Sequence, residues 1–176
     1  RLVADTSEVV AKAHARNVAV EGEVGALPEI GDSGFDDSRA SLTTVEQAFD
    51  FVAATGVDCL AVAVGNVHFV TSDFVPTVDI DRIKAIDDAV SVPLVMHGGS
   101  GTPDDQMVAA IAAGITKINV GTKLKFLFGN RLQQRLQSAA DWDPNLVLGS
   151  HLEGDWLTDA AGAVHDEVRR LIRVFG

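Results

Sequence analysis

The stretch PLVMHGGSG, at residues 93–101, decides the fold. Its first half is an apolar run that ends at Met96, and its second half is a histidine followed by a glycine-rich turn. A run in which every side chain is apolar predicts a strand that is buried on both faces, as in a parallel sheet. Polar and glycine-rich turns directly after such strands are typical of the sites of parallel α/β proteins.

The segment before this stretch has the same organisation of helix, apolar strand and polar strand end. Thr44 and Gln47 have the spacing of a capping box, which predicts a helix that Gly56 ends. Residues 57–64 then form a strand that is apolar except for Asp58, and it stops at GNVH in residues 65–68. The repetition of helix and buried strand predicts a parallel sheet.

The rest of the chain extends the pattern to four strands. Strands are predicted at residues 18–20, 57–64, 92–96 and 115–120. Between the last two, Thr102 as N-cap opens a helix that Gly114 closes, whereas the turn-forming residues 28–41 predict a loop. Two long helices follow the last strand. The fold class is therefore α/β.

Composition limits the function classes. The 176 residues suit one domain, and their net charge of −11 argues against a nucleic-acid or anionic membrane surface. The apolar runs are far shorter than the roughly 20 residues that span a bilayer. A single cysteine, Cys59, fits a reducing cytoplasm. Because Arg1 is not preceded by methionine, we expect the amino terminus to be incomplete.

The turn after residue 97 is a candidate phosphate site. Glycine lets the backbone approach an anion closely, and the helix that follows presents free N–H groups. Gly98, Gly99 and Gly101 supply the glycines, Ser100 adds a hydroxyl, and Thr122 stands at the start of a later helix. A tight structural turn explains the same glycines equally well.

Two histidines are candidate metal ligands. His68 and His97 end neighbouring predicted strands and flank the glycine turn, as expected of ligands that come from adjacent strands. A catalytic zinc ion needs three protein ligands and one open position. The third ligand is therefore missing, or it lies in a segment outside this sequence.

Three charged residues allow more than one interpretation. Glu21 and Glu23 share one face of their strand by alternation, where they bind a metal, handle protons or form ion pairs. If the sheet closes into a barrel, Lys117 either forms a structural ion pair with a carboxylate inside the barrel or forms a Schiff base with a ketose.

Four segments together resemble a known family. VEGEVG (20–25), TGVD (55–58) with LAVAVGNVH (60–68), PLVMHGGSG (93–101) and KINVGT (117–122) resemble, in that order, the class II fructose- and tagatose-bisphosphate aldolases. The resemblance covers nearly the whole chain. It implies a (β/α)₈ barrel, of which residues 1–176 hold strands five to eight as the C-terminal half of one domain.

The resemblance also implies the chemistry. It suggests zinc-dependent cleavage of a ketose 1,6-bisphosphate to dihydroxyacetone phosphate and an aldehyde phosphate, by a homo-oligomer. The implied metal residues are His68, His97 and Glu23. The implied substrate-binding residues are Gly98, Gly99, Ser100, Asn119, Gly121 and Thr122. A monovalent cation, sodium or potassium, is implied near the backbone carbonyls of Val67 and Gly98.

Parts of the family pattern differ or are absent. The third zinc-binding histidine and the catalytic aspartate of the family belong to a strand that would precede Arg1. Phe69 stands where the family usually has glycine, and the acidic loop of the family reads PEIGDSG at residues 28–34. Either Glu29 or Asp32 replaces its acidic residue, or no residue does. These differences motivate an alternative function, a non-catalytic barrel that binds a sugar phosphate or supports a catalytic partner.

Overall fold

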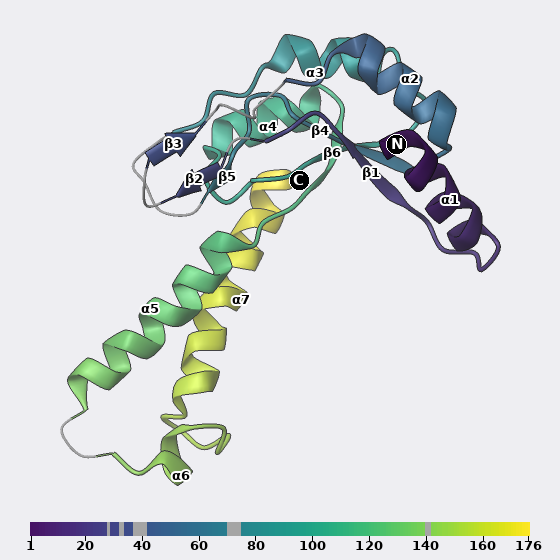
Figure 1. Cartoon of the computed structure of the whole chain (residues 1–176). Coiled ribbons are helices and arrows are strands. Elements are labelled where there is room, and N and C mark those ends of the chain that lie inside the picture. Colours follow the sequence, from purple (N-terminus) through teal and green to yellow (C-terminus); the bar gives the residue numbers. More distant parts are fainter. Residues whose placement is uncertain (28, 32–33, 37–41, 70–74, 140–141) are drawn as a thin grey trace. The chain divides into compact units, whose positions relative to one another are not determined.

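The computed structural model describes residues 1–27, 29–31, 34–36, 42–69, 75–139 and 142–176 (Figure 1). The chain divides into two compact units, Arg1–Val120 and Gly121–Gly176, and each is described by itself. The first unit holds both sheets of the described residues, and the second unit is helical.

A four-stranded parallel sheet forms the centre of the first unit. Its order is β1-β4-β6-β7, so each strand pairs in parallel with the next one in the sheet. The strands are β1 (Glu21–Val24), β4 (Cys59–Val62), β6 (Leu94–Met96) and β7 (Ile115–Ile118). The predicted parallel α/β sheet of four strands is thereby confirmed.

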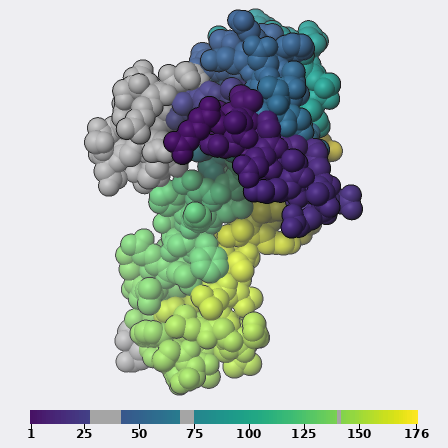
Figure 2. All heavy atoms as spheres, turned by 45° about the vertical axis from the view of Figure 1, so that its right-hand side comes forward, coloured from purple at the N-terminus to yellow at the C-terminus, as the bar shows by residue number. Residues whose placement is uncertain are grey.

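A helix connects each strand of the parallel sheet to the next one along the chain, and a further helix precedes β1. They are α1 (Leu2–His14), α2 (Val45–Thr55), α3 (Ile80–Asp87) and α4 (Asp104–Ala112). Helices α1 and α2 lie side by side, and both are visible on one face of the unit (Figure 2). Helix α2 has the predicted capping box of Thr44 and Gln47, and Gly56 ends it in the left-handed conformation with a φ of 69°.

The core of this unit lies at the two middle strands. Leu60 on β4 and Leu94 and Met96 on β6 are fully buried, as are Ile83 and Ile86 of α3. Successive residues of β4 from Leu60 onward are buried, although their side chains point to alternate faces. Both faces of β4 are therefore covered, which is what the apolar run predicted.

A second, smaller sheet includes the segment that carries His68. Its order is β3-β2-β5, with β2 (Glu29–Gly31), β3 (Gly34–Asp36) and β5 (His68–Phe69). The backbone of Glu29 pairs in parallel with that of His68. The prediction of a loop throughout residues 28–41 was wrong in this part, because β2 and β3 form a short hairpin. Positions 28, 32–33 and 37–41 lie outside the described residues.

The last three strands of the parallel sheet are shorter than predicted, at residues 59–62, 94–96 and 115–118, and two further predicted boundaries differ from the structure. The first strand is Glu21–Val24 instead of residues 18–20, where Val18 is 54% exposed. Val20 donates its N–H to the carboxylate of Asp58 and accepts the backbone N–H of Asp58 at its carbonyl. Val20 therefore stands just before the ladder, which begins at Glu21 and Cys59. Helix α4 begins at Asp104 with Pro103 as its N-cap, so Thr102 is not the cap.

The second unit is an antiparallel pair of long helices. It consists of α5 (Thr122–Ser138), the short α6 (Pro144–Val147) and α7 (Trp156–Phe175). Arg131 on α5 pairs with Asp159 on α7, and Lys123 near the start of α5 pairs with Glu167 farther along α7. Among the described residues, every helix is too short or too polar to cross a lipid bilayer.

Candidate active site

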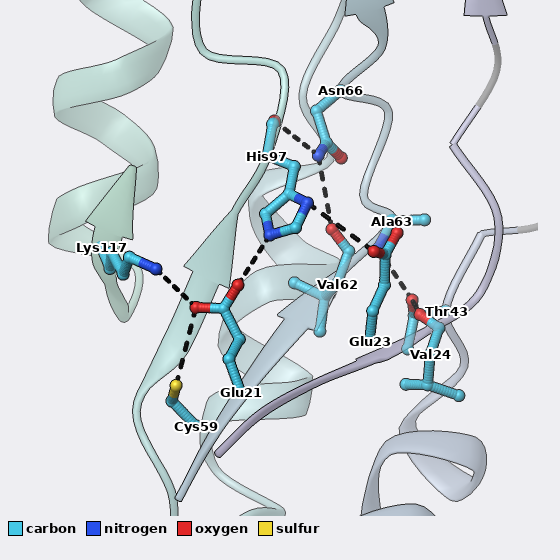
Figure 3. Close-up of polar contacts among 10 residues, drawn as sticks. All are labelled: Glu21, Glu23, Val24, Thr43, Cys59, Val62, Ala63, Asn66, His97 and Lys117. Atoms are coloured by element: carbon cyan, nitrogen blue, oxygen red, sulfur yellow. Dashed lines mark hydrogen bonds and ion pairs between the residues drawn. The ribbon is translucent and has the colours of Figure 1, made fainter. Parts of the chain in front are cut away.

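Five side chains, four from β1, β4 and β7 and one from the residue directly after β6, meet at one face of the first unit (Figure 3). We call this group the His97 cluster. It comprises Glu21, Glu23, Cys59, His97 and Lys117. Alternation along β1 places both glutamates on the same face, as predicted.

Small residues on the strand between them allow the glutamates to reach His97. In the register of β1 and β4, Glu21 lies opposite Cys59 and Glu23 lies opposite Ala61. These small side chains leave room for a carboxylate to extend over β4 towards β6. The register thus brings together residues that are 76 positions apart in the sequence.

Glu21 bridges two basic side chains. Its Oε1 lies 2.9 Å from Nε2 of His97, and its Oε2 lies 2.6 Å from Nζ of Lys117. Glu23 lies on the other side of the imidazole, with its Oε2 3.7 Å from Nδ1 of His97. His97 and Glu21 are mostly shielded, with side-chain exposures of 20% and 25%. The imidazole therefore lies between two carboxylates.

The electrostatics of the cluster follow from these contacts. Partial burial raises the pKa of Glu21, but the hydrogen bonds from Lys117 and His97 outweigh it, and the net pKa is lowered. The hydrogen bond to Glu21 raises the pKa of Lys117. Partial burial raises the pKa of the Cys59 thiol. Glu21 is thus held as a carboxylate and Lys117 as an ammonium group.

These contacts bear on the two interpretations of Lys117. The predicted ion pair with a carboxylate is confirmed, because Nζ of Lys117 contacts Glu21 directly. A Schiff-base lysine needs a neutral amine, usually obtained by lowering its pKa. The direction of the shift at Lys117 is the opposite.

His68 lies beside His97, although it comes from β5 of the small sheet. The two rings are stacked, with centroids 6.2 Å apart and an angle of 16° between their planes. Imidazole nitrogens and carboxylate oxygens are ordinary zinc ligands, so His68, His97 and Glu23 fit zinc in their chemistry. The described residues contain no group of three or more His, Cys, Asp or Glu side chains arranged to hold a metal ion.

Asn66 supports His97 and was not singled out from the sequence. Its side chain is fully buried, and its Nδ2 donates to the carbonyl oxygen of His97 at 2.9 Å. Its Oδ1 accepts the backbone N–H of Val64 at 2.8 Å. The available signal was an asparagine within GNVH, a residue type that often bonds to nearby backbone. Glu21 was likewise considered from the sequence but not assigned to the metal site.

The glycine turn is shaped by close backbone packing. Gly98 has a φ of 71°, and a Cβ there would lie 2.0 Å from the carbonyl oxygen of Val67. A Cβ at Gly99 would lie 2.5 Å from Cγ2 of Ile118, and the N–H of Gly99 donates to the carbonyl of Asn119 at 3.1 Å. Both glycines are therefore required by the turn itself, which is the structural interpretation left open by the sequence.

The other candidate substrate residues fall in two places. Ser100 is half-buried in the turn, and Asn119 follows β7, where its N–H donates to the carbonyl of Met96 at 2.9 Å. Both belong to the first unit. Gly121 is the N-cap of α5 and Thr122 is its first residue, so these two belong to the second unit.

Residues 3–176 match the family described as fructose-bisphosphate aldolase class-II. The chain is 34% identical over 175 residues to the D-tagatose-1,6-bisphosphate aldolase subunit GatY of Klebsiella oxytoca. It also resembles the crystal structure of the YdjI aldolase of Escherichia coli K12, with a TM-score of 0.73 and 30% identity. The fructose-bisphosphate aldolase of Campylobacter jejuni shares the fold, with a TM-score of 0.68 and 19% identity.

The chain is matched almost completely in each case, but it spans little more than half of each relative. The matches cover 99%, 99% and 98% of this chain. They cover 58% of GatY, 54% of YdjI and 56% of the Campylobacter protein.

Proposed function

This chain belongs to the class-II fructose-bisphosphate aldolase family, and from that membership we propose that it is the C-terminal half of a ketose-bisphosphate aldolase. The reaction is the reversible cleavage of a ketose 1,6-bisphosphate to dihydroxyacetone phosphate and an aldehyde phosphate. Residues 1–176 would supply strands five to eight of a single (β/α)₈ barrel in the cytoplasm, and a preceding segment would supply the rest.

The observation that carries this proposal is the pair of neighbouring imidazoles, His68 and His97, next to the carboxylate of Glu23. We propose these three residues as zinc ligands or near neighbours of the ion. When bound, zinc supplies a Lewis acid beside the substrate ketone, which favours breaking of the adjacent carbon–carbon bond. The third histidine ligand and the aspartate that acts as general base would come from the preceding segment.

The glycine turn would hold the phosphate of the three-carbon part of the substrate. Gly98, Ser100 and Asn119 of the first unit would bind it, and the same role for Gly121 and Thr122 is proposed from the family resemblance alone. Gly99 would contribute by its lack of a side chain, because its N–H already donates to Asn119. The carbonyls of Val67 and Gly98 would bind the monovalent cation. A substrate held in this way is fixed relative to the reacting bond.

The relatives support the choice of a substrate class, whereas the assembly is proposed from the family resemblance. GatY is described as a subunit of a tagatose-bisphosphate aldolase, and fructose and tagatose bisphosphates are therefore the first substrates to test. We propose a homo-oligomer for the full-length protein. The alternative is a non-catalytic barrel that binds a sugar phosphate or supports a catalytic partner.

Substitution of His97 tests this function. We expect the purified full-length protein to contain stoichiometric zinc and to lose cleavage of both ketose bisphosphates when a chelator removes it. His97→Ala should lower cleavage by at least about 100-fold, since Lewis-acid catalysis contributes several kcal/mol. The measurements are metal analysis and the rate of aldehyde phosphate release.

His14→Ala is the matched control. The Nε2 of His14 also lies 2.9 Å from a carboxylate, that of Asp58, but outside the His97 cluster. The His14→Ala variant should retain both zinc and activity. Metal-free protein that binds a ketose bisphosphate without cleaving it would instead support the alternative. Inactivation by borohydride with substrate, unaffected by chelation, would point to Lys117.

A further inference from the structure

We propose that Glu21 and Lys117 are positioning residues that fix the tautomer of His97, with the proton on Nε2 and the Nδ1 lone pair left for the metal. The inference rests on the proposed function, since it assigns a role to residues that support a metal ligand. It concerns an orientation that the residues of this chain impose before any metal binds.

The first step is the contact between Glu21 and His97 (Figure 3). Oε1 of Glu21 lies 2.9 Å from Nε2 of His97. An ionised carboxylate only accepts hydrogen bonds, so Nε2 must carry the proton in this contact. A neutral imidazole has one protonated nitrogen, and its other nitrogen, Nδ1, then has a free lone pair.

The second step is the contact that holds Glu21 in place. Nζ of Lys117 donates to the other carboxylate oxygen, Oε2, at 2.6 Å. A carboxylate with a partner on each oxygen has a fixed plane, and the ammonium group favours its charged form. Lys117 thus acts on His97 through Glu21, without touching the imidazole.

The third step is the backbone of His97, which is held independently of its ring. Nδ2 of the buried Asn66 donates to the carbonyl oxygen of His97. With the backbone and Nε2 both fixed, the direction of Nδ1 is also fixed. Nδ1 faces the side of the ring where Glu23 lies, at 3.7 Å from its Oε2.

This arrangement matches what zinc sites need from their surroundings. A ligand histidine usually donates its second N–H to a carboxylate, and loss of that partner costs about 10–100-fold in metal affinity or activity. Glu21 has this position relative to His97, and Lys117 gives Glu21 the charge partner that a half-buried carboxylate requires.

The experiment measures the tautomer of His97 and the zinc affinity in the full-length protein. In metal-free protein labelled with ¹⁵N-histidine, we expect NMR shifts of His97 that report protonated Nε2 and unprotonated Nδ1. Glu21→Gln should populate both tautomers, because an amide can donate as well as accept. The zinc affinity of Glu21→Gln, measured by competition with a chromogenic chelator, should be about 10–100-fold weaker than that of the wild type. Lys117→Met should cause a smaller loss in the same direction.

Asp58→Asn is the matched control. Asp58 is also a carboxylate that contacts an imidazole Nε2 at 2.9 Å, but its partner is His14. This variant should leave the tautomer of His97 and the zinc affinity unchanged.

Two results would overturn the inference. The first is a proton on Nδ1 of His97 in the metal-free wild-type protein, a result that does not depend on the folding of any variant. The second is a zinc affinity of Glu21→Gln within about twofold of the wild type. Failure of the proposed function is separate, because it would appear as a wild-type protein that neither binds zinc nor cleaves a ketose bisphosphate.

Discussion

Gly98 occupies a position where any side chain would collide with backbone. Its φ is 71°, and a Cβ would lie 2.0 Å from the carbonyl oxygen of Val67. The left-handed conformation costs other residues about 1–2 kcal/mol, and overpacking adds about 1–3 kcal/mol. We therefore expect Gly98→Ala to lower the free energy of unfolding of the full-length protein by about 2–5 kcal/mol, measured by urea denaturation.

Gly129→Ala is the control for this substitution. Gly129 lies within α5, and a Cβ there would meet no atom within 4 Å. Since glycine destabilises a helix interior by about 0.5–1 kcal/mol relative to alanine, this variant should be slightly more stable than the wild type. If Gly98→Ala were as stable as Gly129→Ala, the close packing of the turn against Val67 would be wrong.

The sequence identified the chemistry of individual residues better than their partners. His68 and His97 were predicted to lie together because their strands are neighbours, and the structure places their rings side by side. The bridge from Glu21 to Lys117 and His97 could not be derived, because it depends on the register of β1 against β4. No local pattern in the sequence specifies that register.

At the scale of elements, the first turn of α7 is fixed by a charged cap. The carboxylate of Asp155 accepts the backbone N–H groups of Leu157 and Thr158, and also that of His151. These hydrogen bonds, above all the one from His151, lower the pKa of Asp155 to about 2 from 3.8. Glu167, in the middle of α7, has a pKa lowered to about 2 from 4.5, chiefly by its hydrogen bond from Arg170.

These pKa values predict a loss of stability in acid. A carboxylate with a lower pKa in the folded state binds fewer protons there than in the unfolded state, so stability rises with pH through this range. For Asp155, the contribution is complete above about pH 4 and is lost as the pH falls towards 2. We expect Asp155→Asn, which keeps an acceptor for the cap, to flatten the dependence of Tm on pH between these values.

Thermal unfolding of the full-length protein at a series of pH values measures this effect. The slope should become shallower without disappearing, because Glu167 titrates in the same range. Curves for wild type and Asp155→Asn that run parallel from pH 4 to 2 would contradict the assigned role of the cap.

Helix ends were more predictable than strand ends. Local chemistry specifies a helix end, and the capping box of Thr44 and the left-handed Gly56 are where the sequence predicted them. Strand limits depend on pairing partners. The first strand was therefore placed at the apolar residues 18–20, whereas the ladder begins at Glu21, whose side chain is held by Lys117 and His97.

At the scale of the whole molecule, the parallel sheet has two open edges in the described part of the chain. β1 pairs only with β4, and β7 pairs only with β6, within the residues described. Exposed strand edges offer unpaired backbone groups to other chains. The proposed barrel would cover these edges with the preceding strands.

The open edges predict the behaviour of this segment in isolation. We expect residues 1–176, purified alone, to self-associate and to unfold at lower urea concentration than the full-length protein. Size-exclusion chromatography with light scattering and urea denaturation would measure both properties. A monomeric segment that unfolds as cooperatively as the full-length protein would argue against a half-barrel.

The buried side chain of Asn66 has a consequence for protein engineering. Its amide donates to the carbonyl of Val62 at the end of β4 and to the carbonyl of His97 after β6. The loops that follow these two strands therefore depend on each other. If GNVH alone were exchanged for a sequence without this asparagine, the loop after β6 would lose the hydrogen bond that Asn66 donates to the carbonyl of His97. Chimeras between this protein and other members of the family should therefore exchange both loops together.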